Sequence, residues 1–215
     1  MTGERPRVLD PVSRASEIVF GLLMALTFTG SISVATPGHE EVRKMMVEAL
    51  GCNLAWGLTD AVMYLVGIAT ERSRGAMLLA RLRATTDAAA AHSLIAATLP
   101  SRIGAVAGSD ELELIRRRLL ASRDTPARAL GRDDFLGALG VFLLVVLATF
   151  PVVIPFAVID TTTLALRVSN AVALVTLFAA GWTLGRYAGI NAWLGGTIMA
   201  ALGTVLIGVI IALGG

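Results

Sequence analysis

Five long apolar blocks restrict this chain to a helical architecture embedded in a membrane. They cover residues 18–35, 45–69, 135–158, 163–184 and 193–213, with polar segments between them. Each block approaches or exceeds the roughly 20 residues that a helix needs to cross the hydrocarbon core of a bilayer. Hydrophobic residues make up 55% of the chain, whereas a soluble domain has about 45–50%. We therefore predict an all-α membrane protein with five transmembrane helices.

One hydrophilic segment, residues 70–132, interrupts the series of apolar blocks and divides the chain into three parts. Residues 1–69 are predicted to form a cytoplasmic N-terminus and transmembrane helices 1 and 2. Residues 70–132 are predicted to form a helical cytoplasmic insert rich in arginine. Residues 133–215 are predicted to form transmembrane helices 3 to 5.

Two helices are predicted inside the insert. Residues 76–97 are rich in alanine, leucine and arginine, and Pro100 follows their end. Ser109 is the expected N-cap of a second helix over residues 110–122. In that helix Leu112, Ile115 and Leu119 lie on one face, so this face is expected to pack against another surface.

The distribution of basic residues predicts the orientation. Seventeen of the 18 basic residues are arginine, and 11 of them lie in residues 70–132. With five spans, one side of the membrane carries fifteen lysines and arginines and the other carries three. By the positive-inside rule, the N-terminus is cytoplasmic and the C-terminus lies on the opposite side of what is expected to be a bacterial inner membrane. Because topology explains the arginines, we expect lipid and not nucleic acid as their partner.

The second apolar block contains unusual polar residues. A carboxylate near the middle of a membrane helix costs about 2.5–3.5 kcal/mol on insertion scales and usually indicates an ion or proton path. Asn53, Trp56, Asp60 and either Met63 or Tyr64 have the spacing of a single helical face. Oxygens from Asp60 and Asn53, with the Met63 thioether, could bind a divalent cation transiently. The alternative is that Asp60 is protonated or hydrogen-bonded and only supports packing.

Other polar residues and prolines complete the candidate set. Glu17 lies at the cytoplasmic end of the first block and Glu48 near the outer end of the second, where either could also be a solvated acid. Pro151 and Pro155 are expected to bend the third transmembrane helix. Asn170 is expected to form an interhelical hydrogen bond. No nucleophile–base pair, phosphate-binding loop or closed metal site is recognised, so we do not predict an enzyme or a permanently bound cofactor.

These features together resemble the vacuolar iron transporter (VIT) family, which has five membrane helices and a cytoplasmic helical insert between the second and third. The segment EIVFGLLMALT at residues 17–27 is similar to the family pattern acidic-x-x-x-Gly-x-x-Asp-Gly-Leu-Thr. Further similarities lie in Glu48 with Gly51 and Gly57, in FPVVIPF at 150–156, in LFAAG at 177–181 followed by Arg186, and in the glycine-rich last block. The resemblance covers roughly residues 15–213 and implies a homodimer built on the first two helices.

The chain also departs from the family pattern. Met24 stands at the second acidic position of the first helix, and Trp56 lies near the place of a methionine in the second. The insert contains only Glu71, Glu111 and Glu113 as glutamates, whereas the iron-transporting relatives have many.

Two functions are compatible with these features. The first is export of Fe²⁺ or Mn²⁺ from the cytoplasm by proton antiport, with Glu17 at the cytoplasmic mouth and Asp60, helped by Asn53 and Met63, holding the ion midway. The second is a non-transporting membrane scaffold or regulator on the same fold. In that case the arginine-rich insert would bind anionic lipid or a partner protein.

Overall fold

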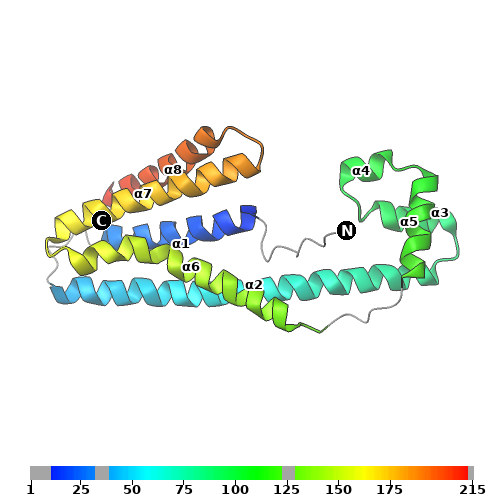
Figure 1. Cartoon of the computed structure of the whole chain (residues 1–215), viewed down its shortest axis with the longest axis horizontal. Helices are drawn as coiled ribbons and strands as arrows, with labels where there is room; N and C mark the ends of the chain where they lie inside the picture. The colour runs from blue at the N-terminus through cyan, green and yellow to red at the C-terminus, as the bar shows by residue number, and fades with distance from the viewer. Residues whose placement is uncertain (1–10, 32–38, 123–128, 213–215) are drawn as a thin grey trace. The chain divides into compact units, whose positions relative to one another are not determined.

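The computed structural model describes residues 11–31, 39–122 and 129–212, and all regular structure in these ranges is helical. The helices are α1 (Pro11–Ser31), α2 (His39–Ala84), α3 (Ala88–Ala96), α4 (Ser101–Val106), α5 (Ser109–Ala121), α6 (Arg132–Val158), α7 (Thr162–Tyr187) and α8 (Ala192–Ala212) (Figure 1). The chain forms two compact units. The membrane unit comprises Met1–Tyr64 and Asp133–Gly215, and the insert unit comprises Leu65–Arg132.

The membrane unit contains α1, the first part of α2, and α6 to α8, which run alternately in opposite directions (Figure 1). Four helical segments are long and apolar enough to cross a membrane, namely Val42–Ala84, Arg132–Val158, Thr162–Tyr187 and Ala192–Ala212. Among the described residues of α1, a shorter apolar stretch, Ser16–Thr27, was found. The prediction of an all-α membrane protein is therefore confirmed, whereas the fifth span stays a prediction.

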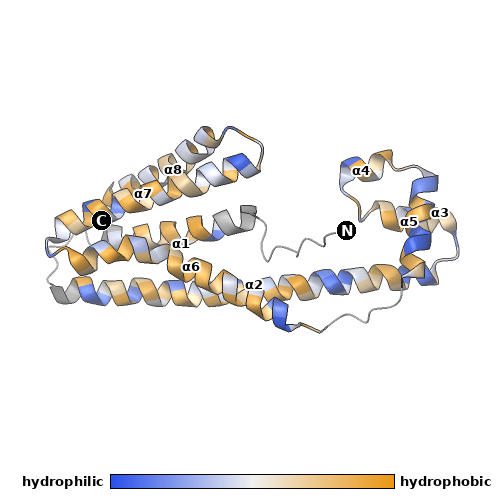
Figure 2. Ribbon diagram, in the orientation of Figure 1, coloured by the Kyte–Doolittle hydropathy of each residue, from blue (hydrophilic) through white to orange (hydrophobic). Residues whose placement is uncertain are grey.

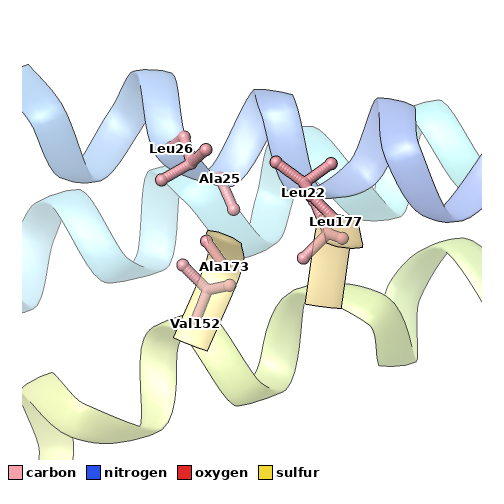
Figure 3. Close-up of a cluster of buried hydrophobic side chains, with 6 residues drawn as sticks. All are labelled: Leu22, Ala25, Leu26, Val152, Ala173 and Leu177. Carbon is pink, nitrogen blue, oxygen red and sulfur yellow. The ribbon is translucent and has the colours of Figure 1, made fainter. Parts of the chain in front are cut away.

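A small hydrophobic core holds α1 to the other helices of the membrane unit. Six buried residues form it: Leu22, Ala25 and Leu26 from α1, Val152 from α6, and Ala173 and Leu177 from α7 (Figure 3). Many apolar side chains elsewhere point outward, such as Val175, which is 69% exposed, and Val205, which is 65% exposed. Figure 2 shows that α6 to α8 are predominantly hydrophobic along their length. This distribution suits helices that are surrounded by lipid, where apolar side chains need no burial within the protein.

Pro151 and Pro155 lie inside α6, and the bend expected of them stays a prediction. A proline has no N–H, so Pro155 leaves the Pro151 carbonyl without its usual helical donor. One residue further along, the buried Ser169 hydroxyl of α7 donates a hydrogen bond of 2.7 Å to the Val152 carbonyl. A polar contact between helices thus lies in the segment that the prolines disturb, in agreement with the way membrane proteins compensate for proline.

The insert unit begins differently from the prediction. Helix α2 continues past the apolar block to Ala84, so the predicted single helix over residues 76–97 is wrong. The backbone breaks at residues 85–87, and Asp87 caps the following helix α3. Its two carboxylate oxygens accept hydrogen bonds from the Ala89 and Ala90 amides at 3.2 and 3.1 Å. Aspartate is a strong N-cap because it satisfies amides that have no partner within the helix, and this signal was not recognised.

The insert unit has its own core, formed by Leu82, Ala91, Ile95 and Leu112. Ile115 and Leu119 of α5 pack against this core, so the predicted apolar face is confirmed. The predicted cap of α5 is wrong by one residue: its N-cap is Gly108, and no side chain caps this end. In consequence the α5 helix is held mainly by its packing.

A cluster of charged side chains also connects α3 with α5. The Glu113 carboxylate lies 3.1 Å from His92 Nε2, 2.7 Å from Arg116 Nε and 2.9 Å from Arg117 Nε. Hydrogen bonds from Arg116 and, to a smaller extent, from Arg117 and His92 hold the pKa of the Glu113 carboxyl well below its usual range. The His92 contact is the one that crosses between helices.

This cluster predicts a dependence of the insert unit's stability on acid. An unfolded glutamate takes up a proton at about pH 4.3, whereas folded Glu113 stays ionised at that pH. Stability is therefore expected to be full above that pH and to fall as the pH is lowered through it. Glu113→Gln should remove this part of the acid dependence. Amide hydrogen exchange in α3 and α5 of the full chain, with wild type and variant compared at each pH from 3 to 6, would check it; parallel pH profiles would contradict it.

Candidate cation site between α1 and α2

Two carboxyl groups meet in the membrane unit. Helices α1 and α2 run antiparallel (Figure 1), and the carboxyl group of Glu17, near the start of α1, lies close enough to that of Asp60 in α2 for the two groups to interact electrostatically. Two carboxylates close together repel each other when both are ionised. Such a pair is stabilised when one proton or one cation is shared between its two groups. From the sequence, Glu17 was expected at the cytoplasmic mouth of an ion path and Asp60 midway along it. In the structure the two carboxyl groups lie next to each other.

Two buried side-chain oxygen atoms of α2 lack hydrogen-bond donors. Asp60 Oδ2 is buried without a partner, and so is Asn53 Oδ1. The Asn53 side chain is only 1% exposed, and its Nδ2 donates to the Ala49 carbonyl at 3.1 Å. Buried polar atoms are nearly always satisfied, so those that are not need an explanation. Both atoms here are acceptors, and a cation, a proton or a water molecule would satisfy them.

Glycines bring α1, α2 and α6 together around Asn53. A Cβ atom added at Gly21 of α1 would lie 3.8 Å from Asn53 Oδ1 and 3.4 Å from the Val145 carbonyl oxygen of α6. A Cβ atom added at Gly57 of α2 would lie 3.2 Å from the Phe142 carbonyl oxygen. The missing side chains therefore allow a close approach of three backbones, which is the usual role of small residues in membrane helices.

Aromatic side chains lie one helical turn from the acid pair, on the same two helices. Phe20 of α1 and Trp56 of α2 contact each other with ring centroids 6.4 Å apart and an interplanar angle of 56°. Phe20 is 55% exposed and Trp56 is 38% exposed. Trp56 was predicted on the same face as Asn53, but Asn53 is buried, so Trp56 lies toward the outside of the α1–α2 pair.

Two predicted site residues are not brought to the acid pair. Met63 is 59% exposed, so its thioether is on the outer surface of α2. Glu48 is also exposed and lines an open depression with Arg43, Lys44 and Val47. In the part of the chain that the structure describes, no three or more His, Cys, Asp or Glu residues are grouped as metal ligands. The candidate site therefore consists of Glu17 and Asp60, and the buried carboxamide oxygen of Asn53 lies seven residues before Asp60 on α2, about 10 Å away along the helix axis.

Sequence reasoning missed the partnership of these residues and misjudged Asn170. The contact between Glu17 and Asp60 depends on the register of two helices, which spacing along one helix does not show. Gly21, four residues after Glu17, was a signal that α1 approaches another helix closely at this level. Asn170 was expected to form an interhelical hydrogen bond, but its carboxamide oxygen is buried with no partner.

All the unpartnered buried side-chain atoms found among the described residues, namely Asn53 Oδ1, Asp60 Oδ2 and Asn170 Oδ1, are oxygens that can only accept. Such an arrangement suits a positively charged ligand and repels an anion. No protein-family model matches this chain, and no curated protein is significantly similar to it.

Proposed function

We propose that this protein is a membrane transporter that exports Fe²⁺ or Mn²⁺ from the cytoplasm in exchange for protons. The observation that supports this proposal is the close pair of carboxyl groups, Glu17 and Asp60, together with two unpartnered buried oxygens on α2, Asp60 Oδ2 and Asn53 Oδ1. Isolated acids in membrane helices are costly, and they are characteristic of ion and proton pathways.

The chemistry of the pair accounts for the exchange. With one shared proton the pair carries one negative charge, and without it the pair carries two. A divalent cation that binds both carboxylates neutralises two charges, so it competes directly with the proton. Binding of the cation therefore releases the proton, and reprotonation from the other side releases the cation. This competition needs no other titratable group.

The donor atoms support the choice of ion. Carboxylate and carboxamide oxygens suit hard cations such as Mn²⁺, and Fe²⁺ is proposed because of the resemblance to vacuolar iron transporters. In this proposal the ion is the substrate, not a resident cofactor. The homodimer, the cytoplasmic N-terminus and the location in a bacterial inner membrane belong to the same proposal.

Transport by the wild-type chain tests the proposal. Purified protein in liposomes should carry Mn²⁺ or Fe²⁺ down a concentration gradient and should move protons in the opposite direction. A metal-sensitive dye and a pH-sensitive dye in the lumen follow the two fluxes, and protein-free liposomes give the background. Ion flux equal to that background for both metals would refute the transport function.

A second function is favoured by the insert unit. This unit has a core of its own, and Arg81, Arg83, Arg102 and Arg117 are exposed on it. A positively charged unit next to a membrane attracts anionic lipid headgroups at about 1 kcal/mol for each basic residue near the surface. A scaffold or regulator of this kind would show salt-sensitive binding of the 70–132 segment to anionic vesicles and no metal flux by the whole protein.

A further inference from the structure

Asn170 of α7 has a buried carboxamide oxygen that nothing in the acid pair explains. Its Oδ1 has no hydrogen-bond partner. The residue lies within α7, which is one of the helices long and apolar enough to cross the membrane. Leaving a buried polar atom unsatisfied costs about 1–3 kcal/mol. A ligand at this position would remove that cost.

The hydrophobic core gives the level of Asn170 in the bundle. Helices α1 and α7 run antiparallel (Figure 1), and in the core Leu22 lies beside Leu177 and Ala25 beside Ala173 (Figure 3). One helical turn further in the same direction, α1 reaches Thr29 and α7 reaches Asn170. Twelve residues separate Glu17 from Thr29 along α1, which corresponds to about 18 Å. The acid pair and Asn170 are therefore at different depths, with the hydrophobic core between them.

Other oxygen atoms gather at the depth of Asn170. Thr29 is 1% exposed, and its hydroxyl makes only a long hydrogen bond of 3.3 Å to the Leu26 carbonyl. Ser169 is fully buried and bonds to the Val152 carbonyl of α6. The Pro151 carbonyl precedes that of Val152 in the chain. It has no helical donor, because Pro155, four residues later, has no N–H. The side chains of Thr29, Ser169 and Asn170 are polar and uncharged, and the nearest charged residue along α7 is Arg167, which is exposed.

We propose that Asn170 and Thr29 form a second cation station, on the far side of the core from Glu17 and Asp60. The proposal rests on the proposed transport function and identifies where the ion goes after it leaves the acid pair. A neutral oxygen site binds a divalent cation more weakly than two carboxylates do, and weak binding favours release. The Leu22–Leu26–Leu177 core separates the two stations, so an ion passes only when the helices move apart there.

The test measures the apparent affinity of the protein for Mn²⁺ separately on each side of the membrane. In liposomes with uniformly oriented protein, Mn²⁺ is supplied either from the side where α1 begins or from the side where α1 ends. Asn170→Leu removes the carboxamide and keeps a similar volume. It should raise the half-saturating Mn²⁺ concentration on the side where α1 ends by about tenfold and leave the other side unchanged. Thr204→Val is the matched control, because Thr204 is exposed on α8 and bonds only within its own helix.

Three outcomes overturn the station. Unchanged half-saturation on both sides for Asn170→Leu would mean that Asn170 holds only a structural water molecule. An equal change on both sides would mean a general loss of structure. If Asn170→Leu fails to fold, Asn170→Asp takes its place: the added charge should lower the half-saturating concentration on the side where α1 ends, and no sided change overturns the proposal.

The station and the transport function can fail independently. Electron paramagnetic resonance of free Mn²⁺ counts the ions bound by the detergent-solubilised full chain, whether or not it transports. The wild type should bind two Mn²⁺ ions per chain, and Asp60→Asn and Asn170→Leu should each bind one. Flux with a single bound ion in the wild type would overturn the station alone, whereas two bound ions without flux would overturn the transport function alone.

Discussion

Asp60→Asn is expected to reduce metal flux through the reconstituted protein by about 100-fold, which corresponds to about 2.7 kcal/mol. The substitution keeps the shape of the side chain, one oxygen atom and a hydrogen-bond donor next to Glu17. What it removes is the negative charge. Two unit charges 4 Å apart interact with about 4 kcal/mol at an effective dielectric constant near 20, so the expected loss lies within the electrostatic contribution.

Two other residues of α2 provide controls for this experiment. Glu48→Gln removes an equal charge from the same helix, but Glu48 is exposed and about 18 Å from Asp60 along the axis. Met63→Leu replaces a thioether that is 59% exposed. Both variants should transport within about twofold of the wild type, since surface substitutions rarely have large effects. Flux by Asp60→Asn at the wild-type rate, in protein that elutes as the wild type does on size exclusion, would remove Asp60 from the mechanism.

The fold could be predicted in outline because membrane helices are marked by composition. The apolar blocks at residues 135–158, 163–184 and 193–213 correspond closely to α6, α7 and α8. The end of α2 could not be placed in this way. Its apolar block ends at residue 69, but the helix continues to Ala84. No proline or glycine-rich turn interrupts residues 70–84, so nothing in the polar sequence stops the helix before Asp87.

The candidate site could be predicted only in part. Charge and burial cost singled out Asp60, because a carboxyl group inside an apolar block is unusual. Glu17 lies at the end of its block, and it was singled out by the resemblance of residues 17–27 to the family pattern. Which residues meet depends on the rotation and register of α1 against α2. Spacing along α2 alone could not separate Asn53, which is buried, from Trp56 and Met63, which are exposed. Gly21 and Gly57 carry that information, because each marks where one helix backbone approaches another.

The contact between α7 and α8 is expected to be the most sensitive to small changes in volume. A Cβ atom added at Gly181 would overlap the Gly195 carbonyl oxygen and lie 2.6 Å from Met199 Cγ. A Cβ atom added at Gly195 would in turn lie 2.5 Å from the Gly181 carbonyl oxygen. Both clashes involve backbone atoms, which no side-chain rotation can relieve. Gly181→Ala should therefore destabilise the folded protein by about 1–3 kcal/mol or more.

Gly208→Ala on α8 is the matched control, because a Cβ atom there would meet no other atom within 4 Å. The same substitution in an open helical position should be neutral or stabilising by up to about 1 kcal/mol, since alanine has the higher helix propensity. Both variants are heated in the same detergent, and the fraction of protein that remains monodisperse is measured at each temperature. The difference between the two midpoint temperatures gives the difference in stability. Equal midpoints for the two variants would show that α7 and α8 can separate at Gly181 without cost, and the close backbone contact would then not contribute to holding the membrane unit together.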